Sequence, residues 1–239
     1  PPQDPENPML RVLPILFERS FAVGREEGYA APVEVRPIAV QLMEEERKEY
    51  QRLTEEIRVF KLRRKDFASP LFTQRKMVVT MAEQKFEALT NLIEEIGHRD
   101  NPARIFVWSE FISALEHAKD HLDGAVRLHT GWRDGMADRY TSAVVHGGMS
   151  KAARREVFMQ WGKSFKILLI AKIGEEGLDY PEVAHGIILA GAKTSRQNVQ
   201  RIGRLLRPMP GKTAKLWVVF CERTMEERIV QLIDLVTDE

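Results

Sequence analysis

The stretch "FKILLIAK", residues 165–172, is a short run of large apolar side chains. Runs of this kind are typical of strands that are buried on both faces of a sheet. Four further runs have the same apolar character: "RIFVW" (104–108), "SAVVHG" (142–147), "HGIILAG" (185–191) and "AKLWVVF" (214–220). Helical patterns separate these runs, at about 110–122, 150–162, 195–206 and 224–236. The alternation predicts an α/β fold, with a parallel sheet and helices on both faces.

The first half of the chain has a different composition and hydrophobic pattern. The opening "PPQDPENPML" is rich in proline and polar residues, which is typical of a linker or of the start of a fragment. "VEVRPIAVQL" (33–42) predicts a strand, and the charged residues 43–65 predict an amphipathic helix that "DFASP" ends. A second helix is expected over about 80–96. Residues 128–141, which are polar and glycine-rich, are expected to form a surface loop or insertion.

Composition excludes several classes of protein. The chain has 239 residues, of which 44% are hydrophobic and 30% charged, as in ordinary globular proteins. Its net charge of +1 does not by itself point to any class of partner, so only local charge clusters can do so. Because Cys221 is the only cysteine, an internal disulfide and a cysteine-rich zinc site are excluded. Its place in "LWVVFC" indicates a core residue rather than a nucleophile. No apolar run is long enough to span a bilayer and no secretion signal opens the sequence, so we expect no membrane partner and a cytoplasmic protein, or a nuclear one if eukaryotic.

One segment contains no acidic residues. Neither Asp nor Glu occurs between Glu182 and Glu222, whereas seven Lys and Arg residues do. Within it, "QRIGRLLRP" (200–208) carries Arg201, Arg204 and Arg207 at a spacing of three, which lets guanidinium groups converge on a helix. Arginine suits planar, bidentate recognition of phosphate. The segment therefore favours a phosphate-binding cluster, and a solvated basic helix face is the alternative.

A second segment of interest directly follows the apolar run at 165–172. In "AKIGEEGLDYPEV" (171–183), a predicted strand leads into a glycine-containing loop with three acidic residues before Pro181. Ligands of α/β sheets gather beyond the carboxyl ends of strands, which is where this loop is expected. The alternative is an ordinary connection in which Asp179 forms a turn.

Taken together, these segments resemble the second RecA-like domain of superfamily 2 helicases. "IFVWSEF" (105–111) resembles their motif IV, "HGGMSKAARR" (146–155) the conserved stretch that follows, "EEGLDYP" (175–181) motif V and "QRIGRLLR" (200–207) motif VI. The charged helix and the last motif are most similar to XPB-type DNA helicases, the branch of repair and transcription. The ending "TMEERIVQLI" (224–233) is also similar to Swi/Snf-type translocases.

The resemblance implies a role for the arginines. In this family two RecA-like lobes clamp ATP, so Arg204 and Arg207 are implied as arginine fingers that meet the γ-phosphate held by the other lobe. Further nucleotide-facing positions are implied by the same motifs: Gly177, Asp179, Gln200 and Arg201.

The resemblance also implies a track for the nucleic-acid backbone. The residues expected along it are Ser109, His146, Gly147 and Lys172. Many relatives have a hydroxyl residue where this chain has Ala171, so Lys172 is expected to meet a phosphate as a point charge instead. For His146, a hydrogen-bonded histidine at a strand end is the alternative. "KLRRK" (61–65) could grip phosphate too, or could simply be a solvated helix end.

Two motifs of the first lobe are missing. The chain has no GxxxxGK[ST] loop for phosphates and no acidic pair such as DEAH for Mg²⁺. ATP and Mg²⁺ are therefore expected to be held mainly by a first lobe, no metal ligands are expected in this chain, and alone it should not hydrolyse ATP. We expect residues 1–35 to be the interlobe linker region, 36–98 a strand plus a thumb-like helical segment, and 99–239 the second RecA-like lobe.

The sequence thus predicts the C-terminal motor lobe of an ATP-dependent, XPB-like DNA helicase or translocase. Its expected partners are DNA as a single strand or a fork, the first lobe of the same protein, and a nuclease or repair protein. An RNA helicase lobe is one alternative, because this lobe contacts the backbone and the sequence does not reveal the sugar. A non-catalytic module that binds nucleic acid or protein is the other.

Overall fold

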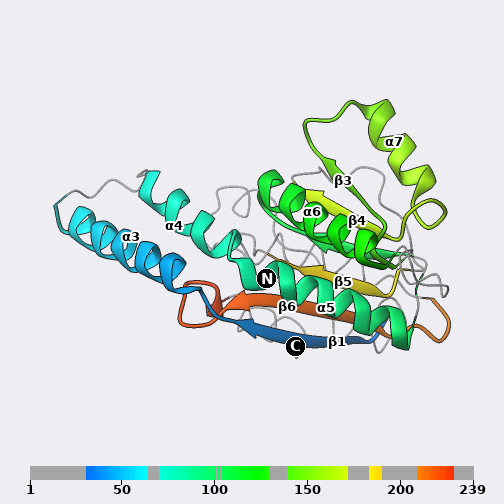
Figure 1. The fold of residues 1–239 in the computed structure, drawn as a ribbon, viewed down its shortest axis with the longest axis horizontal. Helices are drawn as coiled ribbons and strands as arrows, with labels where there is room; N and C mark the ends of the chain where they lie inside the picture. Colours follow the sequence, from blue (N-terminus) through cyan, green and yellow to red (C-terminus); the bar gives the residue numbers. More distant parts are fainter. Residues whose placement is uncertain are drawn as a thin grey trace, which may run out of the picture.

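A six-stranded parallel sheet forms the centre of the computed structural model, which describes residues 31–63, 70–100, 102, 104–129, 139–171, 183–189 and 209–228. The strand order is β1-β6-β5-β2-β4-β3, and every pairing is parallel (Figure 1). The elements in chain order are β1 (Val33–Val40), α3 (Glu44–Arg63), α4 (Pro70–Thr80), α5 (Glu83–Arg99), β2 (Ile105–Trp108), α6 (Ile112–His129), β3 (Ser142–His146), α7 (Lys151–Gln160), β4 (Ile167–Ala171), β5 (His185–Ile188) and β6 (Ala214–Cys221).

The central strands are buried on both faces, as the apolar runs predict. Every residue of β2, β4 and β5 is buried. Because successive side chains of a strand point to opposite faces, the strands supply two separate cores. The α/β prediction with a parallel sheet is confirmed.

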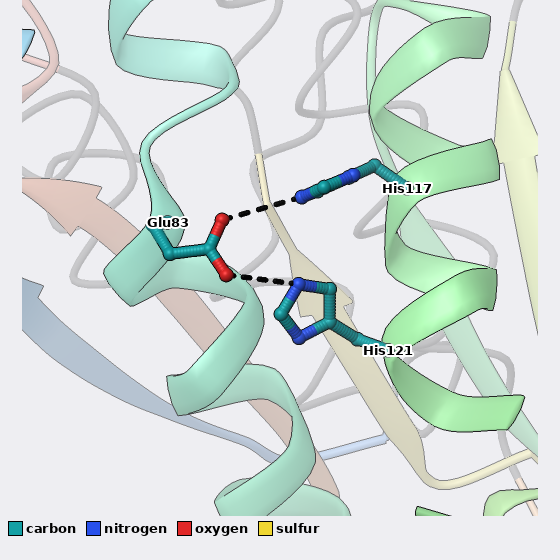
Figure 2. Close-up of side chains that lie close together, drawn as sticks. All are labelled: Glu83, His117 and His121. Atoms are coloured by element: carbon teal, nitrogen blue, oxygen red, sulfur yellow. Dashed lines mark hydrogen bonds and ion pairs between the residues drawn. The ribbon is translucent and has the colours of Figure 1, made fainter. Parts of the chain in front are cut away.

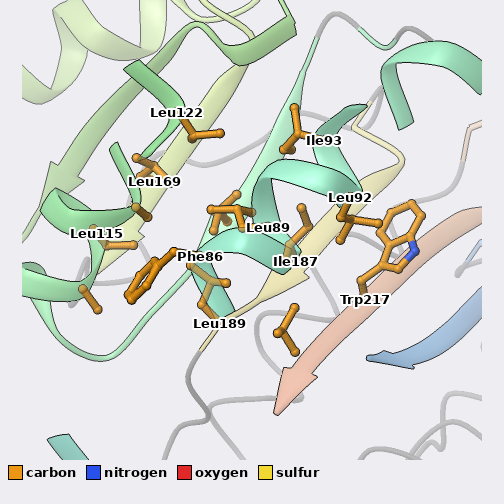
Figure 3. Close-up of a cluster of buried hydrophobic side chains, with 14 of the residues drawn as sticks. Phe86, Leu89, Leu92, Ile93, Leu115, Leu122, Leu169, Ile187, Leu189 and Trp217 are labelled. Atoms are coloured by element: carbon orange, nitrogen blue, oxygen red, sulfur yellow. The ribbon is translucent and has the colours of Figure 1, made fainter. Parts of the chain in front are cut away.

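Helices α5 and α6 cover one face of the sheet, where the larger core forms. Phe86, Leu89 and Leu115 from the two helices pack on Leu169 and Ile187 from the strands, and all five side chains are fully buried (Figure 3). The core of the opposite face includes Trp161, which follows α7, and α7 packs its partly buried apolar side chains there. Described helices therefore lie against both faces.

Helix α4 differs from the prediction. The sequence pattern indicates a helix end at "DFASP" and a new helix from about residue 80, whereas α4 begins at Pro70. Proline lacks the N–H that a first helical residue leaves unused, so it is accepted at that position. Helices α3 and α4 pack along each other, and Figure 1 shows the pair extending beyond the end of the sheet.

The charged side chains of α3 form ion pairs along the helix. Lys48 pairs with Glu44 and Glu45, and Arg58 pairs with Glu55, one turn apart along the exposed face. Such pairs contribute little individually but suit a solvated helix. The side chains of "KLRRK" (61–65) lie outside the described residues.

The segment 36–98 does not stand apart from the sheet in this structure. Strand β1 pairs along its whole length with β6, and α5 supplies part of the larger core. Within the described part of this segment, α3 and α4 are the helices that extend beyond the sheet (Figure 1). The domain boundaries themselves stay a prediction. Among the described helices, none has the length and apolar character that crossing a bilayer requires.

The amino-terminal edge of the sheet contains a buried histidine. His185 begins β5, stacks on Trp217 at a ring distance of 5.3 Å and lies 3.4 Å (Nε2 to Oδ2) from Asp100, which Lys215 also contacts at 2.6 Å. Burial lowers the pKa of His185 to about 4, although the Asp100 carboxylate opposes the shift and Lys215 adds to it.

We expect this histidine to make stability depend on pH. An unfolded histidine titrates near pH 6.5, so between about pH 6.5 and 4 the unfolded chain binds a proton that folded His185 refuses. The free energy of unfolding should fall by about 1–3 kcal/mol as the pH is lowered through this window. Urea unfolding at several pH values should show this dependence in wild type and His98→Gln, an exposed control, and a weaker one in His185→Gln. An equal dependence in His185→Gln would contradict the assignment.

Candidate functional site

The carboxyl ends of all the described strands lie at one edge of the sheet, because every strand is parallel. In the strand order, β2 separates β4 from β5. Adjacent strands are about 4.8 Å apart, so the ends of β4 and β5 lie about 10 Å from each other. From these two ends the chain enters the two segments that carry most of the sequence-predicted site residues.

Most of those predicted residues lie outside the described residues. They are Lys172, Gly177, Asp179, Gln200, Arg201, Arg204 and Arg207. What the structure provides is the strand end before each segment: Ala171 closes β4, and Leu189 follows β5. The roles implied for these seven residues stay predictions.

Ser109 lies at the same edge, directly after β2, and is fully buried in the described structure. Its backbone N–H donates to the carbonyl of Ile170 on β4 at 3.2 Å. Its Oγ accepts a hydrogen bond from the N–H of Phe111 at 3.3 Å. These bonds fix the turn that leads into α6. A contact between Ser109 and nucleic acid stays a prediction.

His146 and Gly147 lie at the end of β3, the edge strand. The Nδ1 of His146 accepts a hydrogen bond from the N–H of Gly148 at 3.2 Å. A Cβ at Gly148 would come within 3.2 Å of the imidazole, so the absence of a side chain lets the ring lie over the turn. This bond supports the alternative of a hydrogen-bonded strand-end histidine.

The turn after His146 leads directly into α7. Ser150 caps this helix, because its side chain accepts from the N–H of Ala153. Gly147 and Gly148 are exposed at this point. A half-buried imidazole and exposed backbone thus occur together at the carboxyl end of β3, which is an arrangement that could face a phosphate backbone.

A buried ion pair lies at this edge, and the sequence pattern does not predict it. The Nζ of Lys85, on α5, lies 2.6 Å from an Oε of Glu226, and both side chains are almost wholly buried. The same Nζ donates to the carbonyl of Leu189 at 2.8 Å. Glu226 accepts the backbone N–H of Cys221, the last residue of β6, at 3.0 Å.

This pair joins three parts of the chain at the carboxyl edge: α5, the end of β5 and the turn after β6. The N–H of Leu189 in addition donates to the carbonyl of Trp108 on β2 at 2.9 Å. Leu189 is thus held through both of its backbone polar groups. The residue that precedes the arginine-containing segment 190–208 is therefore held in place by hydrogen bonds.

The sequence itself indicates that Lys85 is buried. Lys85 shares a helix face with Leu89, Leu92 and Ile96, which form an apolar stripe. A lysine in such a stripe needs a buried partner. The partner could not be identified, because Glu226 lies 141 residues further along the chain.

Cys221 packs against the same pair and is buried. Burial raises the pKa of its thiol to about 12, so the thiolate that a nucleophile needs is disfavoured. A core role, as its sequence context indicates, agrees with this environment.

Comparison with known proteins finds a family model that matches the chain. The model of the family described as "Helicase conserved C-terminal domain" matches residues 84–209, which is more than half of the chain. The match includes both segments that leave the carboxyl edge.

Two curated relatives are archaeal. The putative DNA 3'-5' helicase Rad25 of Halobacterium salinarum is 27% identical over 157 residues, covering 65% of this chain and 22% of the relative. The DNA 3'-5' translocase XPB2 of Sulfurisphaera tokodaii is 25% identical over 235 residues, covering 90% of this chain and 49% of the relative. The chain therefore spans at most about half the length of these two relatives.

Among solved structures, the SWI2/SNF2 ATPase core of Sulfolobus solfataricus, in complex with dsDNA, aligns with 86% of this chain and 45% of its own. The TM-score is 0.61 at 14% sequence identity. This likeness confirms the RecA-like fold of the described sheet and helices.

Breaking the buried pair should destabilise the chain. Lys85→Met leaves the Glu226 carboxylate buried without its cation, which we expect to lower the free energy of unfolding by about 3–5 kcal/mol. Arg58→Met, which breaks an exposed pair on α3, is the matched control and should change stability little. Chemical unfolding of both variants measures the difference. Equal effects would show that the pair does not hold this edge together.

Proposed function

Because the chain belongs to the helicase conserved C-terminal domain family, we propose that it is the C-terminal motor lobe of an ATP-dependent DNA helicase or translocase similar to XPB. One observation carries the proposal. The family match covers 84–209, and so includes the residues that follow β4 and β5 at the carboxyl edge, where α/β sheets bind ligands. The two archaeal relatives are named as a DNA helicase and a DNA translocase, which supports DNA over RNA.

In this proposal Arg204 and Arg207 meet the γ-phosphate of ATP held on a first RecA-like lobe of the same protein. That lobe would also hold most of the Mg²⁺ contacts, and the ion would supply neutralisation of charge on the phosphates. The guanidinium groups donate hydrogen bonds to the γ-phosphate oxygens, over which the negative charge of the transferring phosphoryl group is spread. The surrounding residues 183–221, which contain no acid, leave that positive charge without a competing carboxylate.

Arg201, Gln200, Gly177 and Asp179 complete the proposed nucleotide-facing set. Closure of the two lobes brings the arginines onto ATP, and hydrolysis releases them. A segment that starts from an anchored residue suits this cycle, because the arginines must reach the phosphate in the same geometry each time. The anchoring of Leu189 by Lys85 and Trp108 supports this part of the proposal.

DNA is the proposed polymer, bound as a single strand or at a fork. His146, Gly147 and Lys172 would contact its backbone from the ends of β3 and β4, which are adjacent strands. The buried Ser109 would then act by fixing the turn after β2 rather than by direct contact. A nuclease or repair protein is the proposed further partner, and the protein would act where the DNA is, in the cytoplasm or in a nucleus.

Removing one finger should abolish catalysis without unfolding the protein. In the protein that carries this lobe together with a P-loop lobe, Arg204→Ala or Arg207→Ala should lower kcat for DNA-stimulated ATP hydrolysis about 10³–10⁵-fold. Arg99→Ala, at the far end of α5 where Arg99 pairs only with Glu95 among described residues, is the control and should retain turnover. Circular dichroism checks the fold of each variant. Near-normal turnover in both finger variants would overturn the assignment.

A further inference from the structure

Three potential metal ligands converge between helices α5 and α6. Glu83 is the first residue of α5, and His117 and His121 lie one turn apart on α6. Figure 2 shows the carboxylate of Glu83 facing the two imidazoles, with one oxygen toward each. Its Oε2 lies 3.3 Å from the Nε2 of His117, and its Oε1 lies 3.1 Å from the Nε2 of His121.

The spacing of these atoms is that of a small coordination shell. One ligand atom from each residue can be chosen so that all lie within 4.8 Å of one another. A tetrahedral Zn²⁺ with bonds near 2.0–2.1 Å has ligand atoms about 3.3–3.4 Å apart. The two nitrogen-to-oxygen distances, one to each carboxylate oxygen of Glu83, are close to that edge length. Side-chain rotations that bring both nitrogens around one of these oxygens would complete the three-ligand arrangement.

The two imidazoles pack against the same buried aromatic ring. Phe86, which is fully buried, meets the ring of His117 edge-on at 4.5 Å and stacks with that of His121 at 5.5 Å. Both histidines are partly exposed, with side chains that are 37% and 24% accessible, so an ion can reach them from solvent. The site is thus partly formed before any ion binds.

We propose that Glu83, His117 and His121 bind one divalent transition-metal ion, of which Zn²⁺ is the best fit. Two imidazoles and one carboxylate are ligands that zinc accepts, and two histidines four positions apart on a helix present their rings on one face. Three protein ligands leave a fourth position for water. Both histidines line a groove together with polar side chains, among them Thr90, Asn91 and Asp120.

The bound ion would connect the start of α5 to the middle of α6. Without it, the only interactions between these side chains in the described structure are the two histidine–carboxylate contacts and the edge-on contact of the two imidazoles. A metal replaces the carboxylate contacts with bonds that form only in the folded chain, so occupancy stabilises the helix layer over the larger core. The motifs of the sequence predict no metal ligands in this chain, and the spacing of four between His117 and His121 is the signal that points to them.

The test is metal binding to the full chain, prepared without a histidine tag and stripped with a chelator. Calorimetric titration with ZnCl₂ should give one equivalent, and Co²⁺ should give the intense visible absorption of a four-coordinate ion. Thermal unfolding at a free Zn²⁺ concentration 100 times Kd should shift upward by about 5–10 °C.

Variants separate this site from adventitious binding. His117→Gln and His121→Gln should each weaken Zn²⁺ binding more than the ~10–100-fold seen when an outer-shell partner is lost. Glu83→Gln, which keeps the side-chain shape, should also weaken it and is the variant least able to disturb folding. His98→Gln is the matched control, because His98 also lies one turn from a carboxylate, Glu94, at 3.7 Å on the exposed face of α5.

Wild-type-like affinity in the His98 variant together with loss in the other three would support the proposal. The absence of stoichiometric binding in wild type would overturn it. So would binding that persists unchanged in Glu83→Gln and both histidine variants, because the ion would then lie elsewhere.

Discussion

The buried ion pair between Lys85 and Glu226 is the interaction on which the carboxyl edge depends. Removing two charges from water is costly, and the attraction between them offsets that cost only when their other hydrogen-bonding positions are filled. Here the carbonyl of Leu189 and the N–H of Cys221 fill such positions. Three distant parts of the chain must therefore be placed together, since moving any of them leaves a buried charge unpaired or short of a hydrogen bond.

The parallel sheet explains why so much of the chemistry lies at one edge. Parallel strands that are buried on both faces have only their ends near solvent, and all the carboxyl ends are at the same end of the sheet. Ser109, His146, Ala171 and Leu189 each follow or close a strand at that edge. The cores below provide rigidity, while the segments beyond the strand ends carry the residues proposed to meet ATP and DNA.

The helix layer serves a second purpose on the same face. Helix α5 supplies Lys85 to the edge and Glu83 to the proposed metal site within its first turn. Any tightening between α5 and α6 therefore acts on a helix that also holds the end of β5. Through this connection the proposed metal would affect how firmly the carboxyl edge is held. Its binding can be measured without any motor activity.

Much of the fold can be predicted from local patterns. The apolar runs at 142–147 and 165–172 became β3 and β4 with ends shifted by no more than two residues, because strands buried on both faces need continuous apolar sequence. Helix α4 could not be predicted from Pro70, which both ends and begins helices. Helix α6 continues to His129 through Gly124, whereas the pattern indicates an end near 122, since packing outweighs the weak helix propensity of glycine. The same distinction applies to the candidate site residues. Arg204 and Arg207 can be predicted because their motif is local in the sequence. The pairing of Lys85 with Glu226 and the contact of Glu83 with two histidines cannot, because they depend on how distant segments pack.

The most direct test of the motor-lobe account is ATP hydrolysis by the protein that carries this lobe together with a P-loop lobe. It should be measured alone and with single-stranded DNA, duplex DNA and RNA of matched length. The account predicts turnover that DNA stimulates strongly and RNA stimulates much less. Stimulation by RNA alone would indicate an RNA helicase lobe, and turnover that no nucleic acid stimulates would contradict the account in favour of a binding module.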